Sequence, residues 1–169
     1  IFITNIISPL NLFILLVILL GIFIYKKKWY SSLLLLFSKI GGLFFELLIK
    51  FIIQRARPEN ALIEATGYSF PSGHAIMATI FFSLVLYSFK DNIKNRTIKI
   101  IFIISNIILF LLIGFSRVYL NVHWFSDVMA GFSLGLFWLT LLILVFNIVI
   151  SLSKKTLDIL KNRLEKYIH

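Results

Sequence analysis

Three short groups of polar and charged residues interrupt an otherwise apolar chain, and their residue types suit phosphate chemistry. The groups are Lys50 with Arg57-Pro58, then Pro71-Ser72-Gly73-His74, then Ser116-Arg117 with His123 and Asp127. Cations and helix-terminal amides bind phosphoryl oxygens, and imidazole can serve as nucleophile or proton donor. The sequence therefore predicts one phosphate-handling site built from all three groups.

In the third group, His123 and Asp127 are four positions apart. On a helix they would share a face, where the carboxylate would orient the imidazole or favour its protonated form. A histidine nucleophile needs such a partner. Each residue also has a structural alternative, since His123 could pair with Trp124 at the membrane interface and Asp127 could cap a helix.

The second group is suited to a helix start. Ser72 can cap the helix, Gly73 permits close backbone approach, and the first free amides favour an anion. His74 in the first turn can titrate near neutrality and donate a proton. The alternative is an ordinary capped helix start with no ligand.

The first group supplies cations. Lys50 lies about two turns before Arg57, so in a helix continuing toward Arg57 both would reach one rim, where Pro58 ends or kinks the helix. Together with Arg117 they can neutralise a phosphoryl group in place of a metal ion. Lys50 taken alone fits a snorkelling anchor better than a functional cation.

The elements that position these groups are membrane-spanning helices. The chain has 169 residues and is 60% hydrophobic, against roughly 45–50% in soluble domains. Apolar runs of about 20 residues match a hydrocarbon core about 30 Å thick. The five predicted spans are residues 6–25, 31–53, 72–89, 98–115 and 126–150. Their lack of two-residue alternation favours an all-α helix bundle over a barrel.

The formal net charge is +10. The basic residues lie beside the predicted spans, so this charge indicates the orientation of the chain in the membrane and not nucleic-acid binding. Most of them fall in residues 26–28, 90–99 and 154–166. With five spans these segments share one face, which the positive-inside rule places in the cytoplasm. The site, between the second and third and between the fourth and fifth spans, then faces outward in a multi-pass protein of the cell membrane.

Two domains are predicted, a transmembrane domain over residues 1–150 and an amphipathic cytoplasmic tail over 151–169 that lies on anionic lipid. A charged tail that only anchors orientation is the alternative. The chain begins without Met and with polar residues, as a connecting loop would, so an earlier segment is expected to precede it, with a natural start near Ile1 as the alternative. It lacks signal-peptide features, so residues 6–25 are interpreted as a true span. Cysteine is absent, which excludes a thiolate nucleophile, a disulfide framework and a cysteine metal site.

The three groups resemble the signatures of the type 2 phosphatidic acid phosphatase family of membrane lipid phosphatases. Six residues separate Lys50 from Arg57-Pro58, the Pro71–His74 tetrad is intact, and His123 and Asp127 follow Ser116-Arg117 at the family's spacing. The common Arg-Pro-Arg-Pro ending of the first signature is here Arg55-Ala56-Arg57-Pro58. By motif the resemblance covers residues 50–127, and by helix order nearly the whole chain.

This resemblance implies a metal-independent phosphatase without a cofactor, built on an acid phosphatase/vanadium haloperoxidase-like core. It implies that His123 attacks phosphorus to form a phosphohistidine, that Asp127 holds His123, and that His74 protonates the leaving oxygen. By the same resemblance the phosphate oxygens are bound by Lys50, Arg57, Ser72, Gly73 and Arg117. Family members often have six spans, which again suggests that a first helix precedes this chain. The related haloperoxidases are soluble, so that activity is disfavoured.

The expected substrate is a membrane lipid phosphate whose tail stays in the bilayer. Aromatic residues flank the site at Phe70, Tyr119, Trp124 and Phe125, as suits a headgroup at the membrane rim. An outward site resembles that of bacterial enzymes that recycle undecaprenyl diphosphate, which is the favoured substrate. Phosphatidylglycerophosphate and phosphatidic acid are the alternatives.

Lys39 and Glu46 lie inside the second span, and intramembrane charges often mark transport pathways. A lipid transporter or a non-catalytic lipid-binding protein is therefore the competing function. Glu46 stands one helical turn before Lys50, where it would brace that cation. Bracing is favoured because the other polar residues gather at one rim, whereas carriers place theirs near the midplane.

Overall fold

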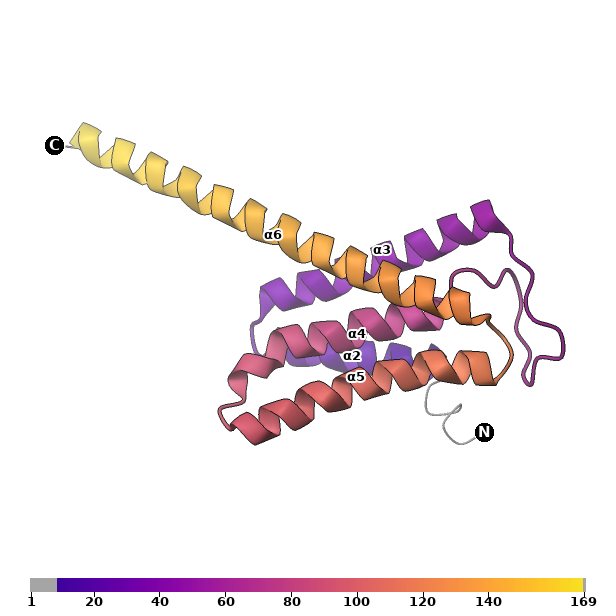
Figure 1. The fold of residues 1–169 in the computed structure, drawn as a ribbon. Helices are drawn as coiled ribbons and strands as arrows, with labels where there is room; N and C mark the ends of the chain where they lie inside the picture. Colours follow the sequence, from indigo (N-terminus) through magenta and orange to yellow (C-terminus); the bar gives the residue numbers. More distant parts are fainter. Residues whose placement is uncertain (1–8, 169) are drawn as a thin grey trace.

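The computed structural model is a helical bundle, and it describes residues 9–168, with side chains described for 14–158 and 160. Its elements are α2 (Pro9–Tyr25), α3 (Trp29–Ile53), α4 (Gly73–Phe89), the short 3-10 helix η1 (Lys90–Asn92), α5 (Arg96–Tyr119) and α6 (Phe125–Ile168). Figure 1 shows α2 to α5 and the first half of α6 side by side. Within the described range there is no strand, so the all-α prediction is confirmed.

Four segments are long and apolar enough to cross a membrane: Trp29–Ile53, Gly73–Asn92, Arg96–Tyr119 and Phe125–Asp158. The fifth, α2, has 17 residues, which at 1.5 Å per residue reach about 25 Å, somewhat less than a hydrocarbon core. Each of the five predicted spans thus corresponds to one apolar helix. The chain is a multi-pass membrane protein.

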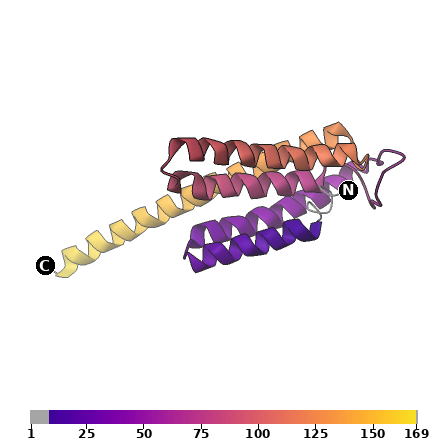
Figure 2. The same ribbon diagram turned by 90° about the horizontal axis from the view of Figure 1, so that it is seen from below.

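The central helix is α4, which packs against α6, α5, α3 and α2. Half of its membrane-length window is buried (50%), against 17% in α5 and in α6. Figure 2 shows α2 and α3 as a pair beside α4 and α5. Because lipid surrounds the outer helices, their large apolar side chains face outward, while Ala75, Ala78 and Leu84 of α4 are fully buried.

Two glycines on one face of α6 allow α4 and α6 to approach closely. A Cβ at Gly131 would meet the carbonyl oxygen of Ser72 at 2.7 Å, and one at Gly135 would meet the carbonyl oxygen of Ile76 at 2.9 Å. Small residues four apart are a common means of close helix packing in membranes. This contact brings the N-terminal ends of α4 and α6 together.

The prediction that the helix continues toward Arg57 is wrong. Helix α3 ends at Ile53, and Gln54 adopts a left-handed conformation (φ 50°, ψ 35°) in which its N–H donates to the carbonyl of Lys50. Such a conformation closes a helix and redirects the chain. Residues 54–72 form a long connection at the end of the bundle, as Figure 1 shows beside the start of α6.

Helix α6 continues through the predicted boundary at residue 150 and runs unbroken to Ile168. In Figure 1 its second half extends beyond the other helices. Residues 151–168 are therefore helical. The amphipathic, lipid-bound character of this segment stays a prediction, because half of its side chains lie outside the described residues. The polar lead of residues 4–8 also lies outside them.

Candidate active site

The three polar groups meet at one end of the bundle. The connection 54–72 is bonded to the turn between α5 and α6, since Leu62 N–H donates to Leu120 O (3.0 Å) and Trp124 Nε1 to Ala56 O (3.1 Å). The backbone N–H of Ser72 donates to the carbonyl of Asp127 at 3.0 Å. These bonds tie all three groups into one framework.

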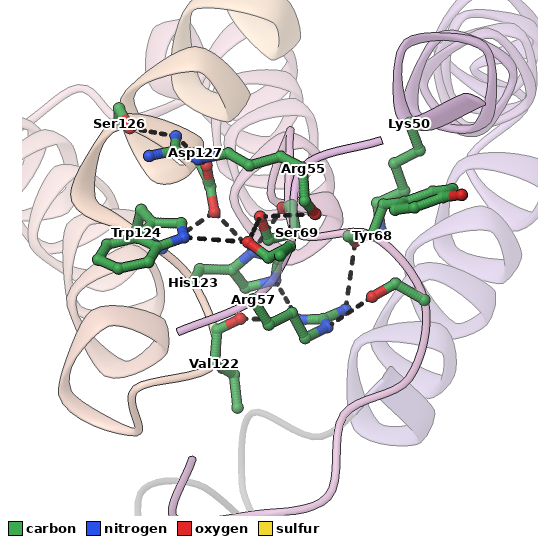
Figure 3. Close-up of polar contacts among 12 residues, drawn as sticks. Lys50, Arg55, Arg57, Tyr68, Ser69, Val122, His123, Trp124, Ser126 and Asp127 are labelled. Atoms are coloured by element: carbon green, nitrogen blue, oxygen red, sulfur yellow. Dashed lines mark hydrogen bonds and ion pairs between the residues drawn. The ribbon is translucent and has the colours of Figure 1, made fainter. Parts of the chain in front are cut away.

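His123 lies in the turn before α6, so the prediction that it shares a helical face with Asp127 is wrong. Its Nδ1 is 2.7 Å from the carbonyl oxygen of Ser69, and its Nε2 is 3.4 Å from Nη1 of Arg57 (Figure 3). A carbonyl only accepts, so Nδ1 carries the hydrogen and Nε2 keeps its lone pair. The lone pair of the ring is thus on Nε2, where it faces Nη1 of Arg57.

The His123 ring is neutral at pH 7. Burial lowers its pKa to about 4, and Arg57 and Lys50 act in the same direction, while the Ser69 carbonyl and Asp127 oppose them. A neutral imidazole whose lone pair faces a cation is suited to nucleophilic attack on a bound anion.

Asp127 lies in the first turn of α6 and is fully buried. Its Oδ2 accepts the N–H of Trp124 at 2.9 Å, and its own N–H donates to Trp124 O at 3.0 Å. The bond from the Trp124 N–H to the Asp127 carboxylate is the half of a capping box that the third helical residue supplies. The same Oδ2 lies 3.5 Å from His123 Nδ1, so Asp127 both caps α6 and lies beside the imidazole.

Arg55 is part of the site, although the sequence analysis gave it no role. Its Nη1 lies 2.8 Å from Asp127 Oδ1 and donates to Ser126 Oγ at 2.6 Å (Figure 3). Its guanidinium also lies over the ring of Trp124, 5.3 Å from the centroid. Arg55 compensates the charge of a buried carboxylate. Its place two residues before Arg57 was the only sequence signal for this role.

Arg57 is fixed by backbone carbonyls from two segments. It donates to Val122 O (2.7 Å), Thr66 O (2.9 Å) and Gly67 O (3.0 Å). Burial lowers the pKa of Arg57, while Asp127 and Glu46 raise it, and the guanidinium keeps its charge, as arginines do in proteins. The site therefore holds a positioned cation next to His123.

Three further donor side chains have buried atoms without a hydrogen-bond partner in the described part of the chain: Ser72 Oγ, His74 Nε2 and Arg117 Nη2. Ser72 is the N-cap residue of α4 but makes no side-chain capping bond, which contradicts the predicted cap. His74 lies within electrostatic range of Arg117, His123, Lys50 and Arg57. Buried polar groups nearly always have partners, so these atoms are suited to a ligand with several acceptor oxygens.

The remaining predicted residues are placed as follows. Lys50 Nζ lies 2.8 Å from Glu46 Oε1, which confirms the predicted bracing contact. Gly73 begins α4 directly after Ser72. Lys39 lines a 260 Å³ cavity with apolar residues of α2 and α3. The charged residues of the three groups therefore lie together at one end of the bundle.

Comparison with known proteins agrees with this geometry. Residues 31–150 match the model of the PAP2 superfamily. Phosphatidylglycerophosphatase B of Bacillus subtilis (strain 168) is 38% identical over 119 residues, covering 69% of this chain and 58% of that protein. An undecaprenyl-diphosphatase of Sulfolobus acidocaldarius is 33% identical over 120 residues, covering 66% of this chain and 53% of that protein. The chain thus spans a little over half the length of these relatives.

Among solved structures, a transmembrane PAP2 type phosphatidylglycerolphosphate phosphatase from Bacillus subtilis matches with a TM-score of 0.75 and 33% identity. The match covers 86% of this chain and 73% of that one. LpxE of Aquifex aeolicus has a TM-score of 0.62 and 24% identity over 82% of this chain and 79% of its own, which is a likeness of fold.

Proposed function

This chain belongs to the PAP2 superfamily, and from that premise and the geometry of its site we propose that it is an integral membrane lipid phosphatase. It hydrolyses a phosphomonoester or diphosphate of a membrane lipid through a phosphohistidine intermediate. The observation that carries the proposal is the set of unpartnered buried atoms on Ser72, His74 and Arg117. They belong to the same site as the neutral, oriented imidazole of His123.

In the proposed reaction, Nε2 of His123 attacks the terminal phosphorus, and the bond from that phosphorus to the leaving oxygen breaks. The leaving oxygen is the bridging oxygen of a diphosphate or the ester oxygen of a monoester. His74 donates a proton to that leaving oxygen. Water then attacks the phosphohistidine and gives a proton to His74, which releases inorganic phosphate and restores both imidazoles. Asp127 and the Ser69 carbonyl, at 3.5 and 2.7 Å from Nδ1, orient the ring throughout.

The phosphoryl charge is neutralised by Lys50, Arg57 and Arg117, with the Ser72 hydroxyl and the Gly73 amide binding further oxygens. Such preorganised donors stabilise the charge that builds up in the transition state. We propose that this set suffices without a metal ion or cofactor. Activity that is undiminished in EDTA is the expected result.

The lipid is proposed from the surroundings of the site and from the relatives. Tyr119, Trp124 and Phe125 are exposed aromatic residues at this end of the bundle, where such side chains suit the membrane interface. The sequence analysis favours undecaprenyl diphosphate, and one relative carries that substrate in its name. The relative with higher identity is named for phosphatidylglycerophosphate, so this lipid is the second candidate. We place the site on the extracytoplasmic face.

The decisive experiment measures phosphate release by the purified protein in detergent with EDTA present. The substrates are undecaprenyl diphosphate, phosphatidylglycerophosphate and phosphatidic acid, and His123→Ala is assayed beside the unchanged chain. Release that falls by at least about 10³-fold in the variant, with an unchanged melting temperature, supports the proposal. Activity retained by the variant would remove His123 as the nucleophile. No release from any lipid by folded protein would favour a non-catalytic or transport function.

A further inference from the structure

Glu46 lies inside the proposed phosphate pocket, although no step of the proposed reaction uses it. Its Oε1 lies 2.8 Å from Lys50 Nζ, and the side chains of Glu46 and Lys50 are only 14% and 19% exposed. A pair so shielded from water interacts more strongly than an exposed one. Lys50, a proposed phosphate ligand, is therefore already paired with an anion in the free protein.

The carboxylate of Glu46 also lies against the first residue of α4. A Cβ added to Gly73 would collide with both carboxylate oxygens and with Cδ of Glu46. The approach is possible only because Gly73 has no side chain. The first turn of a helix is where free amides and the helix dipole favour an anion, so Glu46 occupies an anion position.

Other groups of the pocket are within reach of the same charge. Glu46 acts electrostatically on Arg57. Ser72, which precedes Gly73, and Arg117 each have a buried atom, Oγ and Nη2, without a partner among the described residues. A carboxylate has two acceptor oxygens, whereas a phosphoryl group offers more. Glu46 thus neutralises part of the positive charge of the pocket. It leaves hydrogen-bond donors of the pocket unbonded, and a phosphate group would bind them.

We propose that Glu46 is the resident anion of the phosphate pocket, which pairs with Lys50 against Gly73 in the free protein and yields Lys50 to an entering phosphate group. The inference deepens the proposed function and rests on it. Lys50, Arg57 and Arg117 carry three positive charges, and Glu46 reduces their sum to two, near the charge of a phosphate dianion. The consequence is weaker binding of the product, inorganic phosphate, and faster product release.

This role makes the opposite prediction from simple bracing. If Glu46 only positions Lys50, loss of the carboxylate weakens phosphate binding, because the ammonium loses its orientation. If Glu46 competes with phosphate, loss of the carboxylate strengthens phosphate binding, because both the competition and the repulsion disappear. The direction of the change in phosphate affinity therefore separates the two.

The test uses Glu46→Gln, which keeps the size of the side chain and removes its charge. Its matched control is Glu64→Gln, the same change at an exposed residue of the connection 54–72. The affinity for inorganic phosphate is measured by calorimetry in detergent, without turnover, and kcat and phosphate inhibition are measured with the lipid substrate. Glu46→Gln should bind phosphate roughly tenfold more tightly, a change of about 1.4 kcal/mol, with lower kcat, while Glu64→Gln should match the unchanged chain.

Equal or weaker phosphate binding in folded Glu46→Gln would overturn the inference and leave Glu46 as a brace. If that variant does not fold, Glu46→Ala provides the same comparison, and the same direction of change decides. A chain that hydrolyses lipid phosphates normally while Glu46→Gln shows no tighter phosphate binding contradicts only this inference. A chain that neither binds phosphate nor hydrolyses any lipid phosphate contradicts the proposed function and this inference together.

Discussion

The two ring nitrogens of His123 have different surroundings, and the difference determines the charge of the ring. Nδ1 faces the Ser69 carbonyl at 2.7 Å and Nε2 faces Arg57 at 3.4 Å. Burial and the nearby cations hold the pKa at about 4. The imidazole is therefore neutral above that pH and loses its nucleophilic lone pair below it.

We expect the His123 ring to titrate near pH 4 and Arg57→Gln to raise this midpoint, because a positive neighbour disfavours the protonated form. The measurement is ¹⁵N NMR of histidine-labelled protein in detergent, in which His123→Gln identifies the signal among the three histidines of the chain. A midpoint at the ordinary value of 6.5 in the unchanged chain would show that the ring is not shielded as described.

Arg55 and Asp127 form the ion pair nearest to that ring. We expect Arg55→Gln to shift the acid limb of log(kcat/KM) to higher pH, because Asp127 is then less neutralised and raises the pKa of His123 more. Asp127 is fully buried, so the loss of Arg55 also leaves a buried carboxylate less compensated and should lower the melting temperature.

The control for Arg55→Gln is Arg96→Gln, the same charge change at the far end of α5. Arg55→Lys should restore part of the original pH profile. An Arg55→Gln variant with an unmoved pH profile and reduced thermal stability would mean that Arg55 is only structural.

At the scale of elements, the contact between α4 and α6 determines whether the site assembles. Gly131 faces the carbonyl of Ser72, and Ser72 in turn bonds through its N–H to Asp127. The helix contact and the alignment of two signatures therefore depend on the same few atoms. Side chains larger than hydrogen at Gly131 must push the ends of the two helices apart.

We expect Gly131→Ala to lower the melting temperature in detergent and to reduce kcat, because a Cβ would stand 2.7 Å from Ser72 O and 2.8 Å from Ala75 Cβ. Overpacking of this kind costs about 1–3 kcal/mol. The matched control is Gly21→Ala, where a Cβ would meet nothing within 4 Å and where helix propensity favours alanine. Equal behaviour of the two variants would show that α4 and α6 do not depend on this contact.

The elements were predictable where apolar runs defined them, and less so at their ends. Helix α3 ends at Ile53, and the left-handed residue that follows it is Gln54. Glycine is the usual sequence signal of such a helix end, and that signal is absent here. The contact between the Ser69 carbonyl and His123 was also not predictable from the sequence, because every residue type has a backbone carbonyl. The three signatures, by contrast, depend on side chains, and their residues do meet as predicted.

At the scale of the whole molecule, basic residues and the candidate site occupy opposite ends of the bundle. The connection α2–α3 and the segment around η1 carry Lys26, Lys28 and Lys90, while the site lies where α3 ends and α4 begins. The five apolar helices of the described residues, and the end of the bundle at which each connection lies, were predictable from hydropathy and from the order of the spans. The packing of the helices against one another was not predictable, because the residues that face lipid and the residues that face a neighbouring helix are similarly apolar.

The proposed orientation can be tested with cysteines, of which the chain has none. We expect a cysteine at position 64, in the connection 54–72, to react with a membrane-impermeant maleimide added to intact cells. A cysteine at position 94, between η1 and α5, should react only after permeabilisation. The reverse pattern would place the site on the cytoplasmic face.

The bond from Ser72 to Asp127 joins the two halves of the chain, and this bears on biosynthesis. Residues up to His74 supply cations and amides, whereas the proposed nucleophile and its carboxylate come only with the turn before α6 and its first residues. Chains are made from the N-terminus and fold as they emerge. A ribosome that stalls within α5 therefore leaves a fragment with anion-binding groups but without the imidazole of His123. Under the proposed mechanism, incomplete copies of this protein in the membrane would be unable to hydrolyse the lipids around them.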